Sequence, residues 1–268
     1  LEGPEYETIY AFGGLCMVDS IEEIAFFHVL CDRLGMDTIT AGNLCAFAIE
    51  ASKQGKIDLD IDYGDVIGIE KLLHMIAKRQ GPGEILAHGI KHAAKQWNLE
   101  DIAVHAKGLE PAGYDPRVFK GMGLAYGVSD RGACHLRTTF YKPELAGISP
   151  MDKLEGKAEI LIDFEDRLTI FDTMVLCRFF RDFYTWEELA VMIHSLTGLK
   201  SDKTSLQEKA GNIAQEIRKF NVQEGLTSDD DRLSKGLFRE LTDTKARLTH
   251  EEYEFMLAEY YEIRGWAG

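Results

Sequence analysis

Apolar residues recur at intervals of three and four along most of the chain, which is the spacing that one face of an α-helix requires. After Ser20 the pattern is reinforced by a capping box with Glu23, and Gly35 stands where a helix would end. The same spacing predicts further helices over residues 40–55, 65–78, 84–97, 154–175, 185–196, 206–221 and 250–263. A clear strand-like alternation of polar and apolar residues is confined to residues 57–61. The pattern therefore predicts a mainly α, multihelical protein.

One stretch, residues 107–136, does not follow the helical spacing. Its glycines and prolines are Gly108, Pro111, Gly113, Pro116, Gly121, Gly123, Gly127 and Gly132. Glycine at this density permits close approach of the backbone and weakens a regular helix. Because the stretch also carries large apolar side chains such as Tyr114 and Phe119, we expect a packed loop rather than a flexible linker. A second run, residues 142–152, contains two prolines and a glycine, and it predicts the boundary between two packed helical domains, residues 1–148 and 149–268.

The chain has 45 acidic and 30 basic residues, which gives a formal net charge of −15. This balance argues against nucleic-acid binding, because lysine and arginine are needed to displace counterions from phosphate. No apolar run approaches the roughly 20 residues of a membrane-spanning helix, and no cleavable signal peptide is evident, so no membrane partner is expected. The five cysteines include no C-x-x-C pair, which argues against a zinc ribbon or a thioredoxin-type site and favours a reducing, cytoplasmic setting.

Two segments in the first 40 residues carry candidate functional side chains. Glu5 and Glu7 occupy alternate positions, so an extended backbone would hold both carboxylates on one face and raise the pKa of one of them. The alternative interpretation is a solvated acidic segment. Asp37 and Thr38 directly precede a predicted helix, where their oxygens and the free N–H groups suit polar ring nitrogens, or serve simply to cap the helix.

Two later segments add a histidine, an arginine, an aspartate and a cysteine. His135 titrates near neutral pH and is suited to general acid–base catalysis, and Arg137 offers a planar fork for phosphate or carboxylate. A purely structural histidine is the alternative. Asp172 and Cys177 lie near the end of the helix predicted over residues 154–175. A lone cysteine is usually a buried thiol, since an iron–sulfur cluster needs three more ligands nearby.

Taken in order along the chain, these segments are similar to motifs of the aldehyde:ferredoxin oxidoreductase family of tungstopterin enzymes. The motifs are Gly-Pro-Glu-Tyr-Glu-Thr at 3–8, Asp-x-x-Gly-Met-Asp-Thr at 32–38, Lys-Gly-Leu-Glu at 107–110, Gly-Tyr-Asp-Pro-Arg at 113–117, Lys-Gly-Met-Gly-Leu at 120–124, Arg-Gly-Ala-Cys-His-Leu-Arg at 131–137, Phe-Asn-Val-x-Glu-Gly at 220–225 and Tyr-Tyr-x-x-Arg-Gly-Trp at 260–266. Together they extend over essentially the whole chain. The resemblance implies the family's two helical domains, domains 2 and 3, which close over a tungsten bis-pterin and a [4Fe–4S] cluster. The β-rich N-terminal domain of the family, with its three cluster cysteines, has no counterpart in these residues.

The resemblance also assigns roles to individual residues. Glu7 and His135 match the proton-handling glutamate and histidine beside the metal, with Glu5 as the alternative carboxylate. Cys177 matches the fourth ligand of the iron–sulfur cluster. The residues that match pterin-contacting positions are Asp32, Asp37, Thr38, Arg137 and Asp172. Asp172 and Cys177 match the family's second pterin motif, Asp-x-x-Gly-Leu-Cys, but Val175 replaces its glycine. The valine side chain would crowd a closely approaching pterin.

The resemblance implies an enzyme that oxidises aldehydes to carboxylic acids, in which tungsten or molybdenum takes an electron pair and the cluster passes single electrons to ferredoxin. An aryl-CoA reductase or hydroxycarboxylate oxidoreductase subunit is the alternative within the family, and substrate choice would depend on a pocket near Phe119, Phe140 and Tyr141. A cofactor-free helical interaction module is the alternative of another class. The expected partners are the N-terminal β domain, ferredoxin and a small aldehyde. A second copy of the chain is a further expected partner, in a homodimer. Because much of both cofactor sites belongs to the missing domain, we expect the isolated chain to bind neither cofactor and to be inactive.

Overall fold

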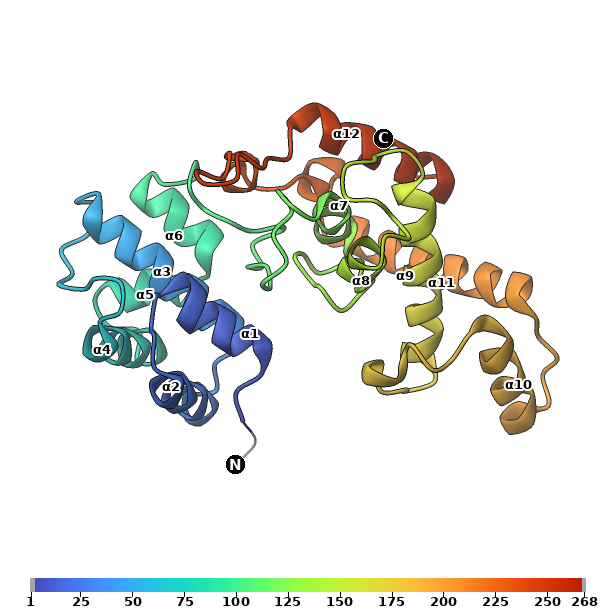
Figure 1. Cartoon of the computed structure of the whole chain (residues 1–268), viewed down its shortest axis with the longest axis horizontal. Coiled ribbons are helices and arrows are strands. Elements are labelled where there is room, and N and C mark those ends of the chain that lie inside the picture. Colours follow the sequence, from blue (N-terminus) through green and yellow to red (C-terminus); the bar gives the residue numbers. More distant parts are fainter. Residues whose placement is uncertain (1–2, 267–268) are drawn as a thin grey trace.

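A computed structural model describes residues 3–266 of the chain. Within these residues the backbone forms helices joined by loops, and β-structure is limited to isolated bridges from Ala106 to Leu109 and Leu233, which confirms the mainly α, multihelical prediction (Figure 1). The α-helices are α1 (Tyr6–Thr8), α2 (Ile21–Leu34), α3 (Thr38–Lys53), α4 (Val66–Ala77), α5 (Pro82–Leu86), α6 (Ile90–Trp97), α7 (Lys120–Val128), α8 (Tyr141–Leu145), α9 (Lys157–Thr173), α10 (Trp186–Thr197), α11 (Lys203–Gln223) and α12 (His250–Arg264). The shorter or wider helices are the π-helix η1 (Ile9–Leu15) and the 3-10 helices η2 (Arg178–Phe180), η3 (Ser228–Asp231) and η4 (Lys235–Phe238). No helix of this described part combines the length and the apolar character needed to cross a lipid bilayer.

Side-chain caps fix where several of these helices begin. The Ser20 hydroxyl accepts a hydrogen bond from the Glu23 N–H at 3.3 Å, which is one half of the predicted capping box, and the Ser20 hydroxyl donates to Glu22. Thr249 and Glu252 form a reciprocal capping box at the start of α12. The ends predicted from apolar spacing agree with the observed ends to within three residues for α2, α4 and α9 to α12.

One local helix prediction is wrong, and one strand-like pattern does not form a strand. The helix predicted over residues 84–97 is divided into α5 and α6, because Gly89 lies between them in a left-handed conformation with φ of +87°. Residues 57–61 form a loop and not a strand. Their alternation has another origin, since Ile57, Leu59 and Ile61 pack against the core while the aspartates between them are exposed.

The glycine-rich stretch contains a helix that sequence alone did not predict. α7 lies within it, and methyl groups on Gly121 and Gly127 would collide with the rings of Phe140 and Tyr253. The missing side chains therefore let α7 pack closely against α8 and α12. Because residues 121–128 are all buried, close packing outweighs the weak helix propensity of glycine.

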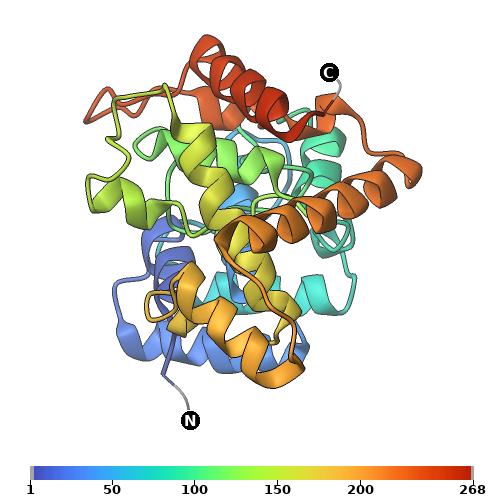
Figure 2. The same ribbon diagram turned by 90° about the vertical axis from the view of Figure 1, so that its right-hand side faces the viewer.

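Buried apolar side chains form three clusters. The first extends over residues 12–103, the second over residues 106–261, and the third over residues 168–210. In Figure 1 the first cluster corresponds to the blue-to-cyan half of the molecule, and the other two belong to the half that contains α7 to α12. Figure 2 shows α11 crossing α9. The helix α9 also packs against α12. The predicted domain boundary after residue 148 stays a prediction.

The run at residues 142–152 is packed into the protein. Glu144 and Ser149 are 2% and 1% exposed, and the Lys157 side chain that follows is equally buried. The Lys157 ammonium lies 2.8 Å from Glu144 Oε1 and 3.2 Å from Ser149 Oγ. Glu144 Oε1 also accepts a hydrogen bond from the Gly121 N–H at 2.9 Å. This buried ion pair therefore ties α8 and α9 to the start of α7.

Val175 has a backbone conformation that valine rarely adopts. It follows α9 with φ of +56°, and its side chain is 91% exposed. A β-branched side chain is disfavoured in this left-handed region, whereas glycine enters it without steric cost. The backbone thus has the shape that suits the glycine expected at this position of the second pterin motif.

Replacing Lys157 with methionine removes the partner of a buried carboxylate. We expect Lys157→Met to lower the free energy of unfolding by about 3–5 kcal/mol, because Glu144 is left buried without a counter-charge. Urea denaturation measures this change, and the exposed Lys153→Met is a matched control expected to stay within about 0.5 kcal/mol. A loss below about 1 kcal/mol in Lys157→Met would show that the pair does not constrain the fold.

Replacing Val175 with glycine relieves the left-handed strain. We expect Val175→Gly to raise the free energy of unfolding by about 1 kcal/mol, because the relief exceeds the entropy that glycine adds to the unfolded chain. The control is Val191→Gly, an exposed site inside α10, which we expect to lose about 0.5 kcal/mol. Thermal unfolding of the three proteins checks both values, and a destabilised Val175→Gly variant would contradict the strain.

Candidate functional site

Glu7 and His135 are far apart in the sequence and lie side by side in the structure. Glu7 belongs to α1, and His135 lies in the loop after α7. His135 Nε2 is 3.6 Å from Glu7 Oε1, and Glu7 Oε2 accepts a hydrogen bond from the Gly113 N–H at 3.0 Å. Tyr6 donates its hydroxyl to the Gly113 carbonyl at 3.1 Å. Both polar groups of Gly113 are therefore bonded to α1, which holds the carboxylate against the imidazole.

Glu5 takes no part in this contact. It is the exposed N-cap residue of α1, whereas Glu7 is 9% exposed. The expected extended segment with both carboxylates on one face is wrong, because the helix begins at Tyr6 and turns Glu7 inward. Of the two carboxylates, Glu7 is the one at the candidate site.

The approach of α1 to the glycine-rich segment requires glycine at position 113. A methyl group on Gly113 would lie 2.8 Å from Cγ of Tyr10 and 3.0 Å from the Tyr6 hydroxyl. Carbon and oxygen atoms that are not bonded do not approach this closely without displacement, so only a residue without Cβ fits. The segment is packed at this point, as predicted for residues 107–136.

Aromatic rings border the contact between carboxylate and imidazole. Tyr114 stacks on Tyr141, with centroids 3.8 Å apart and 6° between the ring planes. The Tyr114 ring also lies 5.8 Å from that of His135 and 5.7 Å from that of Tyr6. Tyr6 and Tyr114 lie within two of the family motifs, at residues 3–8 and 113–117, but the resemblance assigned neither residue a role. Phe140, expected in the substrate pocket, is instead fully buried in the core.

Burial governs the protonation of both groups. It raises the pKa of Glu7, although a backbone N–H and the Tyr114 hydroxyl oppose this effect. It also lowers the pKa of His135 to about 4, with contributions from the guanidinium groups of Arg131 and Arg181. At neutral pH a carboxylate of increased proton affinity therefore faces an uncharged imidazole, and the 3.6 Å contact is not an ion pair. Of the two groups Glu7 is the better proton acceptor at neutral pH, because an imidazole with a pKa of about 4 is a weak base.

Three arginines to which the sequence assigned no role surround the imidazole: Arg131, Arg178 and Arg181. Each donates a hydrogen bond to a residue beside the site, and the acceptors are Cys134 Sγ at 3.1 Å, the Leu136 carbonyl and the Tyr141 hydroxyl at 3.4 Å. Arg181 is 7% exposed and has no carboxylate partner within residues 3–266. Of these three arginines, Arg178 is paired with Asp172, so Arg181 is the buried cation beside the imidazole without a carboxylate partner in the described residues.

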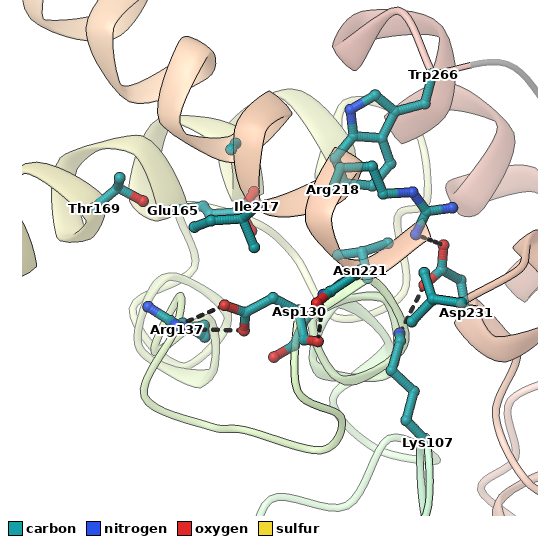
Figure 3. Close-up of a pocket in the computed structure, with 14 residues that line it drawn as sticks. Lys107, Asp130, Arg137, Glu165, Thr169, Ile217, Arg218, Asn221, Asp231 and Trp266 are labelled. Carbon is teal, nitrogen blue, oxygen red and sulfur yellow. Dashed lines mark hydrogen bonds and ion pairs between the residues drawn. The ribbon is translucent and has the colours of Figure 1, made fainter. Parts of the chain in front are cut away.

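Arg137 and Asp172 are also in contact, and their assignment as pterin-contacting residues stays a prediction. Arg137 Nη1 lies 2.9 Å from Asp172 Oδ2. Figure 3 shows the other side of the guanidinium, where Nε and Nη2 donate to the two oxygens of Asp130 at 3.0 and 2.6 Å. Arg178 pairs with the same oxygen of Asp172. The fork of Arg137 is therefore satisfied by carboxylates of this chain.

A buried ionic network lies next to this cluster, in the pocket drawn in Figure 3. Lys107 Nζ is 2.6 Å from Asp231 Oδ1, and Arg218 Nη1 is 2.7 Å from Asp231 Oδ2. Asp231 is fully buried. Asn221 donates a hydrogen bond to the carbonyl of Asp130 at 2.9 Å, beside the ion pair described above. The motif residues Lys107 and Asn221 thus support the structure around the site.

Of the proposed pterin-contacting residues Asp32, Asp37 and Thr38, only Thr38 is bonded to the helix that carries Glu7. Asp37 Oδ2 accepts a hydrogen bond from the Thr40 N–H at 2.8 Å and caps α3, the alternative that the sequence left open. Thr38 shares a 2.8 Å hydrogen bond with Thr8 of α1. Asp32 is exposed near the end of α2 and has no contact with these residues. The structure therefore joins Thr38 to α1 and leaves Asp32 apart.

Cys177 is exposed, whereas the other four cysteines are buried. It is the N-cap residue of η2, directly before Arg178, in the loop that carries Val175. No cluster of three or more histidine, cysteine, aspartate or glutamate side chains suited to a metal ion is found over residues 3–266. The buried thiols agree with the sequence expectation, and Cys177 differs from them in its accessibility.

Comparison with known proteins defines the family of the chain. Residues 1–268 match the family model described as aldehyde ferredoxin oxidoreductase, domains 2 and 3. A tungsten-containing aldehyde ferredoxin oxidoreductase of Pyrococcus furiosus is 32% identical over 282 residues, which cover 99% of this chain and 46% of that protein. The chain thus spans about half the length of the curated relatives it matches.

Two further similarities involve proteins with other activities. The WOR-like subunit of an aliphatic sulfonate oxidoreductase of Pyrococcus furiosus is 33% identical over 150 residues, 51% of this chain and 24% of that protein. A chain of the BamBC active-site complex of benzoyl coenzyme A reductase shares the fold, with a TM-score of 0.74 and 17% identity over 98% of this chain and 46% of that one. Because the family model matches along the entire length, this chain belongs to the aldehyde ferredoxin oxidoreductase family.

Proposed function

We propose that this chain supplies domains 2 and 3 of a tungsten bis-pterin and [4Fe–4S]-dependent oxidoreductase that oxidises aldehydes to carboxylic acids and passes electrons to ferredoxin. The observation that carries the proposal is the contact of Glu7 with His135, two proton-handling groups joined in a member of this family. The name of the Pyrococcus furiosus relative supports tungsten as the metal. Molybdenum is the alternative metal.

The donor groups of the chain suit these cofactors. The proposed pterin contacts are Asp32, Asp37, Thr38, Arg137 and Asp172. Asp32 and Asp37 are exposed carboxylates suited to accept hydrogen bonds from ring N–H groups of a pterin, whereas Asp172 and Arg137 are paired with each other in this structure. The exposed thiol of Cys177 suits one iron of a [4Fe–4S] cluster, which needs four ligands in all. We therefore assign the other three ligands to the N-terminal β-rich domain of the holoenzyme.

The residues of this chain handle the protons of the reaction. Oxidation of an aldehyde by water yields the acid, two electrons and two protons, and the bound metal–pterin group and cluster supply the electron acceptors. Glu7 accepts a proton, because burial raises its pKa, and the uncharged imidazole of His135 relays a proton by taking it up on its free ring nitrogen as it releases one from its N–H. The stacked rings of Tyr114 and Tyr141 limit the access of water to this pair.

The alternatives have weaker support. Likeness to the benzoyl coenzyme A reductase complex concerns the fold alone, so an aryl-CoA reductase or hydroxycarboxylate oxidoreductase subunit stays the second proposal. A cofactor-free interaction module gives no reason for a carboxylate and an imidazole to be buried against each other. The proposed partners are the N-terminal domain, ferredoxin and a small aldehyde in the cytoplasm, and a homodimer stays a prediction.

Variants of Glu7 and His135 test the proton-handling role in a holoenzyme that contains this chain. We expect Glu7→Gln and His135→Gln each to lower kcat for aldehyde oxidation by about 10²–10⁴-fold, the range that general acid–base groups contribute. Tungsten and iron contents should not change, because neither residue is proposed as a ligand. Anaerobic aldehyde-dependent reduction of a viologen dye gives kcat, and metal analysis gives the loading.

Glu5→Gln is the matched control, because that carboxylate is exposed and outside the contact. Its kcat should stay within about twofold of the wild type. A fully loaded Glu7→Gln enzyme with wild-type kcat would contradict the role of Glu7. A holoenzyme that turns over aldehydes without tungsten or molybdenum would contradict the cofactor assignment.

A further inference from the structure

A cavity of about 370 Å³ borders the candidate site, and neither Glu7 nor His135 is part of its lining. Tyr10, Phe47 and Tyr63 contribute aromatic surfaces to its wall. Its aliphatic lining residues are Leu15, Ala46, Ile90, Ile102, Val104 and Leu237. This volume is within the range of about 300–1,000 Å³ found for small-molecule sites, and the wall suits a flat apolar body.

One charged group at this cavity has no side-chain partner in the described part of the chain. Glu50 accepts a hydrogen bond from the Tyr63 hydroxyl at 2.5 Å. Arg117 Nε binds both oxygens of Asp115, at 2.9 and 3.1 Å. Arg239 donates only its Nε, to a backbone carbonyl at 3.3 Å, within residues 3–266. Its terminal nitrogens are thus available to an anion.

Tyr10 connects this cavity with the candidate site. It lies in η1, one helical turn after Glu7, and packs so closely on Gly113 that a methyl group there would be 2.8 Å from its Cγ atom. Ala112, next to the N–H that binds Glu7, also lines the cavity. Burial raises the pKa of Tyr10 to about 12, so its hydroxyl stays protonated at neutral pH and is a hydrogen-bond donor. The cavity and the Glu7 carboxylate therefore share a wall.

We propose that this cavity binds a small planar carboxylate, with its flat body against the aromatic walls and its carboxylate on Arg239 and the Tyr10 hydroxyl. Guanidinium–carboxylate hydrogen bonds are charge-assisted, and a local cation is needed because the whole chain, at −15, repels anions. Carboxylates are also the product class of aldehyde oxidation. The assignment of the bound acid as a product rests on the proposed function, whereas the binding itself does not.

Benzoate is the probe for this proposal, with the 268-residue chain as the protein. Trp97 stacks on Phe47, with centroids 5.7 Å apart and 17° between the ring planes, so occupation of the cavity should change its fluorescence. A saturable change that is absent from the Trp97→Phe variant is expected. Calorimetric titration gives the affinity independently of the reporter.

Arg239→Gln should weaken benzoate binding about tenfold, through loss of the charge-assisted hydrogen bonds. Arg232→Gln is the matched control, an exposed arginine that pairs with Glu254 outside the cavity, and it should bind benzoate as the wild type does. Benzyl alcohol, which has the ring without the carboxylate, should bind the wild type and Arg239→Gln equally weakly. Ala46→Phe fills the cavity and should abolish binding while circular dichroism reports an intact helical fold.

The proposal is overturned if the wild-type chain does not bind benzoate, if Arg239→Gln binds it with unchanged affinity, or if binding survives Ala46→Phe in a folded protein. Because no cofactor takes part, these outcomes are independent of the kcat values of the Glu7 and His135 variants. Failure of benzoate binding would leave the proposed oxidoreductase function untouched. If the kcat values of the Glu7 and His135 variants contradict the proposed function, the cavity still binds a carboxylate, and only the assignment of that acid as a reaction product is lost.

Discussion

The contact between α1 and Gly113 is the interaction on which the candidate site depends. Through it the Glu7 carboxylate and the Tyr6 hydroxyl occupy both polar groups of one glycine, and the ring of Tyr10 fills the space where a side chain would be. This contact joins the part of the chain with the first hydrophobic cluster to the segment that leads to His135. Removal of water at the contact raises the pKa of Glu7 and lowers that of His135, so packing and proton chemistry have one physical cause.

Buried charges fix the other side of the site. Lys157 with Glu144, and Asp231 with Lys107 and Arg218, are ion pairs enclosed by the second cluster. Each costs desolvation, which the paired charges offset only at close range, so each favours one arrangement of the helices and loops that it joins. The arrangement orients α8, whose first residue, Tyr141, stacks on Tyr114 beside the imidazole.

The sequence predicted the helices well because their signals are local. Apolar spacing and caps such as that of Ser20 act within one or two turns, and the predicted ends were close to those observed. α7 was missed because its glycines lower helix propensity, and their benefit arises from contact with distant residues such as Tyr253. Motif resemblance identified Glu7 and His135, but their 3.6 Å contact and the arginines around them, such as Arg181, depend on tertiary packing that no local pattern reports.

The pKa of His135, followed by NMR titration of its imidazole, tests the account most directly. In the wild-type chain we expect a value near 4, so the folded state loses stability as the pH falls from about 6.5 towards 4, where the unfolded chain alone takes up the proton. Gly113→Ala should force Tyr10 and α1 away, admit water and return the pKa towards 6.5, while His105, lowered to about 4 by burial elsewhere, stays unchanged. A wild-type value near 6.5, or a value near 4 that persists in Gly113→Ala, would contradict the dependence of the site on this contact.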